Sequence, residues 1–162
     1  MGSGNIKSLK ENDMADLSGF ATKKLADEGV LLPVIIDGIR FPMAIQIFGS
    51  DSDVVQEYER ERIRKLMKSS TKKNNKGLDE EEVDELLDDQ DEGVILRMGK
   101  IVTYDWKKKR VVENEPVVLY DKTITNDHDS KAYLIEEMPA IKDWVKEKSD
   151  ERGNFLSAGK KN

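Results

Sequence analysis

The single histidine is the first residue to test for chemistry. His128 lies in the stretch NDHDSK, between two aspartates whose carboxylates favour the charged imidazolium form. A hydrolytic triad would also need a serine on a strained turn, and no G-x-S-x-G sequence occurs. Zinc needs three or four converging nitrogen or sulfur ligands, whereas the chain offers one imidazole and no cysteine. We therefore expect His128 to be a surface residue beside a helix cap.

Two acidic stretches contain the residue types that bind calcium, GSDSD at 49–53 and DDQDEG at 88–93. A calcium loop needs spaced oxygen ligands, a turn glycine and a distal glutamate. The register that begins at Asp51 supplies no third ligand, and the second stretch lacks the distal glutamate. Phosphate binding is disfavoured at 49–53, because two aspartates already occupy the start of the following helix. Carboxylates are too abundant to single out an acid/base pair, so we predict no catalytic residue, no metal site, no cofactor and no enzymatic activity.

The composition is that of a polar, acidic chain. Its 162 residues are 37% hydrophobic and 37% charged, enough for one modest core and hence one small domain. The net charge of −6 argues against nucleic acid as the principal partner. No apolar run approaches the roughly 18 residues of a membrane span, and the lack of cysteine fits a reducing cytoplasm. The basic cluster at 68–76 lacks interleaved aromatic residues, so a flexible linker is predicted at 68–77.

The elements that position these residues begin with a helix and a β-hairpin. Residues 1–14 are expected to form a flexible arm, and residues 15–28 an amphipathic helix ended by a glycine. Asp37 and Gly38 stand between two β-branched runs, which predicts a hairpin with a type I′ turn. Proline cannot donate to a strand ladder, so Pro33 and the proline at position 42 predict an open edge or a bulge.

A long helix and an acidic segment follow. Gly49 is predicted to end the second strand, and Ser50 or Asp51 to cap a helix over 51–68. Asp79 is predicted to cap the next helix. Ten of the fourteen residues from 79 to 92 are acidic, and they either keep the region soluble or attract a basic partner. From 93 to 106 strand and helix patterns conflict, and we predict that the helix continues to about Tyr104.

The last third predicts a short hairpin and two helices. Residues 107–126 read as irregular or hairpin-like, followed by a helix over 127–137 and another that has Pro139 in its first turn and ends before Gly153. The fold class is therefore α+β, mostly helical, with one domain at 15–156 and a flexible tail at 157–162. The residues predicted to mark element boundaries are Asp37, Gly38, Gly49, Asp51, Asp79 and Gly153.

Aromatic residues are the best candidates for contact with a partner. Trp144 falls on the apolar face of the last helix and is predicted to belong to the core. Tyr104 and Trp106 lie beside the basic tetrad KKKR, where they serve either the core or a contact surface. The hypothesis for a partner-binding surface names Tyr104, Trp106, Phe155 and Leu156.

Five motifs follow one another along the chain: FATKKLADEGVLLPV, IQIFGSDSDVVQEYERERIRK, TYDW, TITND and MPAIKDWVKEKSDERGNFL. Their order resembles small proteins from the tail module of tailed bacteriophages, including tail assembly chaperones. The long acidic segment and KKKRVVENEP, which follows Trp106, depart from the family pattern. The positions that the resemblance implies to recur in the family correspond in this sequence to Gly29, Gly49, Asp51, Ser52, Tyr58, Trp106, Asn126, Asn154 and Phe155.

The resemblance implies a non-enzymatic protein that acts in the host cell cytoplasm during assembly. Such a chaperone binds tape-measure, tail-tube or neck proteins, and a homo-oligomer is possible; no nucleic acid or membrane is expected as partner. The alternative is a structural component of the mature virion, in the tail or at the head-to-tail connection.

Overall fold

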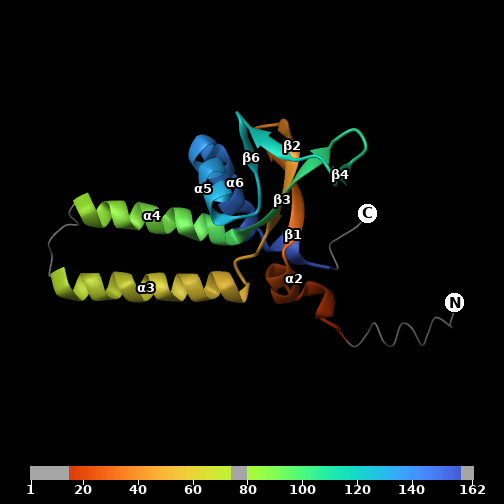
Figure 1. Cartoon of the computed structure of the whole chain (residues 1–162). Coiled ribbons are helices and arrows are strands. Elements are labelled where there is room, and N and C mark those ends of the chain that lie inside the picture. The colour runs from red at the N-terminus through yellow and green to blue at the C-terminus, as the bar shows by residue number, and fades with distance from the viewer. Residues whose placement is uncertain (1–14, 74–79, 158–162) are drawn as a thin grey trace.

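The structure is a computed structural model that describes residues 15–73 and 80–157. These residues form five α-helices and six strands in two antiparallel sheets, which confirms the α+β class with an N-terminal hairpin (Figure 1). In chain order the elements are a 3₁₀ turn Ser18–Phe20, α2 Lys23–Glu28, β1 Val30–Ile36, β2 Ile39–Ile47, α3 Asp53–Lys73, α4 Glu80–Arg97, β3 Met98–Asp105, β4 Arg110–Val112, β5 Val117–Leu119, β6 Lys122–Ile124, α5 His128–Glu137, α6 Pro139–Asp150 and a 3₁₀ turn Arg152–Phe155.

The first hairpin forms as predicted. Asp37 and Gly38 have φ angles of 53° and 79°, the left-handed values that a type I′ turn requires. The ladder between β1 and β2 is irregular after Pro33, whose partner is Ala44, because the next paired residue, Ile35, lies opposite Arg40. Position 42 falls inside this irregular stretch, and Pro33 lies on β1, an edge strand of its sheet, so the two prolines occupy a bulge and an edge.

The larger sheet has the order β1-β2-β3-β4, and α6 packs against β1 and β2. Ile141, Trp144 and Val145 of α6 are buried in the same core as apolar residues of the sheet such as Ile45 and Ile47. Each buried side chain of this size contributes about 1.5–3 kcal/mol through removal of apolar surface from water. Trp144 therefore belongs to the core, as predicted, and Pro139 occupies the first turn of α6.

The prediction of helix to about Tyr104 is wrong. Helix α4 ends at Arg97, and the chain turns directly into β3. Thr103 pairs with Met43 and Ile101 with Ile45, so β3 fills the place beside β2. A local apolar stripe favoured helix, but pairing with a distant strand outweighs this weak preference and suits the β-branched residues.

Three helix boundaries also differ from the predictions. Ser52, not Ser50 or Asp51, caps α3: its hydroxyl accepts from the N–H of Val55 at 3.4 Å. Helix α3 continues to Lys73, so the first residues of the predicted linker are helical. Gly153 does not act as a left-handed stop after α6, because Glu151 is the C-cap and position 153 lies in the final 3₁₀ turn.

The remaining predicted boundaries agree with the structure only in part. The helix predicted over 15–28 is divided into a 3₁₀ turn and the shorter α2. The second short hairpin is present as β5 and β6, and Asp127 caps α5 by accepting from the N–H of Ser130 at 2.8 Å. The cap predicted at Asp79, the expected arm at 1–14 and all but the first residue of the expected tail at 157–162 lie outside the described residues.

Candidate functional site: the helical hairpin

Helices α3 and α4 lie side by side and extend away from the rest of the molecule (Figure 1). We call this pair the helical hairpin. At about 1.5 Å per residue, the 21 residues of α3 span roughly 31 Å. No residue of 60–69 or 80–92 is buried, whereas Val55 and the end of α4 from Gly93 onward contribute to the interior. The outer half of the hairpin therefore has no core of its own to pack on.

The base of the hairpin is fixed by contacts between Tyr58 and Arg97 and their neighbours. The Tyr58 ring lies against Gly93, and its hydroxyl donates to the carbonyl of Asp89. Burial raises the pKa of Tyr58, which keeps the phenol in its neutral, donating form. The Arg97 guanidinium donates to the carbonyl of Gly93 at 2.7 Å and to the Glu59 carboxylate at 3.1 Å. These contacts hold α3 and α4 together at the base of the hairpin.

Two ion pairs join α4 to the C-terminal helices. His128 Nε2 lies 2.8 Å from a carboxylate oxygen of Glu92, and Lys142 Nζ lies 2.8 Å from Asp91. The Glu92 carboxylate, followed by Asp129, raises the pKa of His128. His128 is thus exposed beside a helix cap, as predicted, but its main partner is a carboxylate 36 residues earlier in the chain, which local sequence could not reveal.

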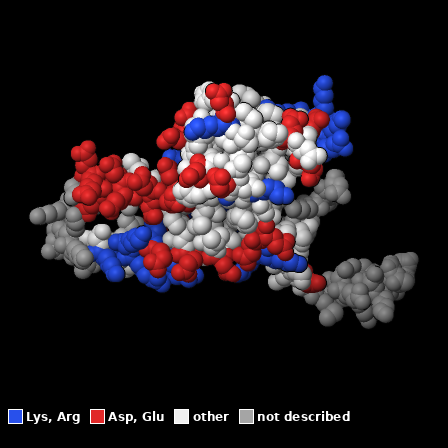
Figure 2. All heavy atoms as spheres, in the orientation of Figure 1, with Lys and Arg blue, Asp and Glu red and all other residues white. Residues whose placement is uncertain are grey.

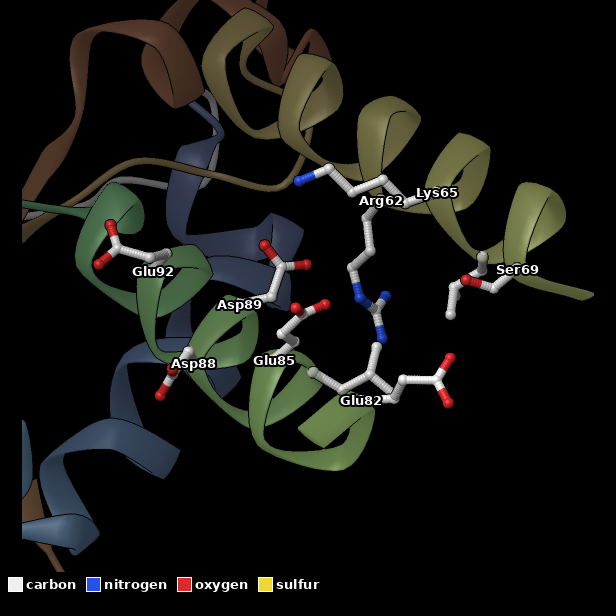
Figure 3. Close-up of a pocket in the computed structure, with 10 residues that line it drawn as sticks. Arg62, Lys65, Ser69, Glu82, Glu85, Asp88, Asp89 and Glu92 are labelled. Carbon is white, nitrogen blue, oxygen red and sulfur yellow. The ribbon is translucent and has the colours of Figure 1, made fainter. Parts of the chain in front are cut away.

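A groove of about 360 Å³ opens along one side of the hairpin (Figure 3). Carboxylates of α4 line one wall, and the Arg62 side chain reaches across from α3 toward them. The lining residues are Arg62, Lys65, Leu66, Ser69, Glu82, Glu85, Leu86, Asp88, Asp89 and Glu92. Cations and anions from the two helices thus already meet in this groove.

The opposite side of the hairpin is apolar. Each helix turns about 100° per residue, so the residue that follows an inward-facing residue points sideways. Because the two helices are antiparallel, these sideways residues of α3 and α4 lie on the same side of the pair. Tyr58 of α3 meets Asp89 and Gly93 of α4, and rows at three- or four-residue spacing continue from this contact to Arg62 and Leu66 on α3 and to Leu86 and Glu82 on α4. The residues that follow these inward-facing ones are Ile63, Met67, Val83 and Leu87. These four side chains are 53%, 66%, 41% and 54% exposed. We call them the apolar face.

The two helices of the hairpin differ in charge (Figure 2). Asp and Glu gather along α4, while α3 carries Lys and Arg. On α3, Arg60 and Arg64 each have a glutamate three residues earlier as ion-pair partner. Within the described part of the chain, no ion pair reaches Glu80 or Asp84, which flank Val83 and Leu87 on α4. The uncompensated charge beside the apolar face is therefore negative.

The residues predicted to bind a partner lie elsewhere. Phe155 is only 1% exposed and belongs to the core, so its assignment to a contact surface is wrong: the final 3₁₀ turn folds it inward. Leu156 is half-buried. Tyr104 and Trp106 are half-buried in an edge-to-face pair with ring centroids 5.0 Å apart. The Trp106 indole N–H donates to the carbonyl of Phe41 at 2.7 Å, so this ring also serves the sheet.

The GSDSD stretch joins three segments. Asp51 accepts two hydrogen bonds from Arg152, at 2.8 and 2.9 Å, and another from the Thr22 hydroxyl. These donors lower the pKa of Asp51 to about 2, Arg152 contributing most. A Cβ at Gly49 would lie 2.7 Å from Ala26 and 3.0 Å from the Phe155 ring. The stretch is a strand-to-helix connection, as predicted, and it also ties both ends of the domain together.

The positions singled out by the phage resemblance make structural contacts. The side chain of Asn126 accepts from the N–H of Ile101 at 2.8 Å, and that of Asn154 donates to the carbonyl of Lys148 at 3.0 Å. Ser52 is fully buried.

Comparison with protein-family models, curated proteins and solved structures gave no match.

Metal and membrane features can be judged for residues 15–73 and 80–157 alone. There, no group of three or more His, Asp or Glu side chains is arranged to hold a metal ion. In the same ranges no helix has the length and apolar character needed to span a bilayer.

Proposed function

We propose that this protein is a non-enzymatic assembly protein that binds its partner through the helical hairpin. The observation that carries this proposal is the apolar face, in which four apolar side chains lie exposed on two helices that project from the body. Exposed apolar side chains gathered on one face are typical of protein-binding surfaces, whereas single exposed apolar residues need no explanation. The contacts of Tyr58 and Arg97 at the base support this use, because they hold the two helices together before binding and a preorganised surface loses less entropy.

The class of partner follows from the resemblance to phage tail-module proteins. We propose a tail assembly chaperone that binds tape-measure, tail-tube or neck subunits in the host cytoplasm before they assemble. Such a chaperone would cover apolar surface on the subunit until the subunit meets its own neighbours. Tyr104 and Trp106 stay candidates for a second contact, since both rings are half-buried rather than enclosed.

The test is co-purification with tail-tube and tape-measure proteins encoded beside this chain and produced in the same cells. We expect Leu87→Ser to abolish co-purification. Val118→Ser is the matched control, because Val118 lies on β5 and is 55% exposed against 54% for Leu87. Circular dichroism should show both variants folded. Equal retention of the partner by both variants would exclude the hairpin as the binding surface.

Mass spectrometry of purified particles separates a chaperone from a virion component. We expect the protein to be absent from particles while it is present in infected cells. Presence at a fixed stoichiometry would instead identify a structural protein of the tail or the head-to-tail connection.

A further inference from the structure

We propose that the apolar face binds a basic amphipathic α-helix of the partner protein. This inference rests on the proposed assembly function and specifies the chemistry of the segment that the hairpin recognises. Its basis is the combination of an apolar surface shared by two antiparallel helices and the uncompensated carboxylates along one edge of that surface.

The shape of the face suits one helix. Ile63 and Met67 lie one turn apart on α3, and Val83 and Leu87 lie one turn apart on α4. A third helix placed over the seam between α3 and α4 would contact all four, with apolar residues at i, i+3 or i+4 and i+7. Helices pack with their axes about 8–10 Å apart, so the arrangement is a three-helix bundle of which this chain supplies two members.

Charge selects a basic partner. Helix α4 carries nine carboxylates and one arginine, whereas α3 carries four carboxylates and seven Lys or Arg residues, which gives the hairpin a net charge of −5. The basic residues nearest the face on α3, Arg60 and Arg64, already pair with Glu57 and Glu61. Lys and Arg on the flank of the partner helix would meet Glu80 and Asp84, which have no ion pair within the described residues.

The same charge disfavours a second copy of this chain as the occupant. Two hairpins packed face to face would bring together two helix pairs that each carry a net charge of −5. Like charges across an interface are repulsive, and the repulsion is strongest at low salt. A basic helix removes this repulsion and covers the same apolar side chains.

The test uses the full chain and a labelled peptide of about 18 residues, five helical turns, with Leu on one face and Lys on the other. A scrambled peptide of identical composition keeps the charge and lacks the apolar face. By fluorescence anisotropy, we expect the amphipathic peptide to bind at least about tenfold tighter than the scrambled one. Leu87→Ser should weaken its binding about tenfold, and Val118→Ser should leave it unchanged.

A charge variant tests the second half of the proposal without disturbing packing. Glu80→Gln with Asp84→Asn should weaken binding and reduce its dependence on salt. The control neutralises two exposed carboxylates elsewhere, Glu113→Gln with Asp121→Asn, and should have less effect. Equal effects of the two double variants would show that only net charge matters and would overturn the proposal.

Two further outcomes would also overturn it. Equal binding of the amphipathic and scrambled peptides would exclude an apolar contact. Self-association in sedimentation analysis that Leu87→Ser abolishes would make a second copy the occupant.

If the phage subunits co-purify in a Leu87-dependent way but the peptide does not bind, the basic helix is wrong and the assembly function stands. If the peptide binds and no phage subunit co-purifies, the assembly function fails instead.

Discussion

Gly93 of α4 lies directly against the ring of Tyr58 of α3. A Cβ built at position 93 would stand 2.7 Å from three atoms of the tyrosine side chain, closer than real Cβ atoms approach their neighbours. The contact brings the two backbones together at the base of the hairpin, where the Tyr58 hydroxyl reaches the carbonyl of Asp89. A glycine inside a helix, normally unfavourable, is thus explained by the close approach of its neighbour.

We predict that Gly93→Ala lowers the free energy of unfolding by about 1–3 kcal/mol, because the ring must move away from a well-packed contact. Elsewhere in a helix the same change raises stability by roughly 1 kcal/mol. Thermal or denaturant unfolding measures the difference. Gly153→Ala is the control, since nothing lies within 4 Å of its added Cβ, and it should be nearly neutral. A Gly93→Ala protein as stable as the parent would contradict the close contact.

The turn at Gly38 gives a second prediction. With φ at 79°, a β-branched side chain is strained whatever the surrounding space, so Gly38→Val should cost roughly 1–3 kcal/mol of stability. Gly38→Asn should cost much less, because asparagine tolerates the left-handed conformation. Comparison of the melting temperatures of the valine and asparagine variants separates backbone strain from the effect of adding any side chain at this position. An unchanged melting temperature in the valine variant would mean that the type I′ turn is absent.

Phe155 gives a third prediction. The ring is 1% exposed and contacts the junction at Gly49, so Phe155→Ala should destabilise the domain by about 3–5 kcal/mol. Removal of the residues after Gly153 should therefore unfold the protein rather than release a partner from a folded one. Leu156→Ala, at a half-buried position, should cost less. Denaturant titration measures the free energy of unfolding of both variants. Equal, small losses of stability would show that the final 3₁₀ turn does not dock against the domain.

Local chemistry explains which elements were predictable from the sequence. The turn at Asp37 and Gly38, the start of the helix near Asp127 and the proline at the start of α6 depend on residues within a few positions of one another. Each follows from a side chain that supplies a required φ angle or hydrogen bond. The buried Trp144 was also predictable, because helical periodicity alone places it on the inner face.

The errors have a common physical cause, which is contact between residues far apart in sequence. Strand β3 depends on β2, and Asp51 is held by Arg152, 101 residues later, rather than by the helix that it precedes. The helix over 51–68 was predicted, but sequence alone could not show that the outer half of α3 has no core to cover. Only the structure reveals that Ile63 and Leu87 lie on the same side of a projecting hairpin.

The ion pair between His128 and Glu92 gives the last prediction. Glu92 is the largest cause of the raised pKa of His128, so Glu92→Gln should return that pKa toward the ordinary value of about 6.5. Asp129, whose carboxylate is 3.8 Å from the other ring nitrogen, contributes less, and Asp129→Asn should give a smaller change. Because the chain has one histidine, an NMR titration of its imidazole protons follows this group without ambiguity.

The sign of the pH dependence follows from the direction of the shift. A raised pKa in the folded state means that the imidazolium stabilises the fold fully below about pH 6.5 and that this contribution is lost as the pH rises through the folded pKa. The stability difference between the parent and Glu92→Gln should therefore be largest near pH 5 to 6, where Glu92 is ionised and His128 is charged, and should vanish at alkaline pH. A difference that grew with rising pH would show that the neutral imidazole, not the ion pair, joins α4 to α5.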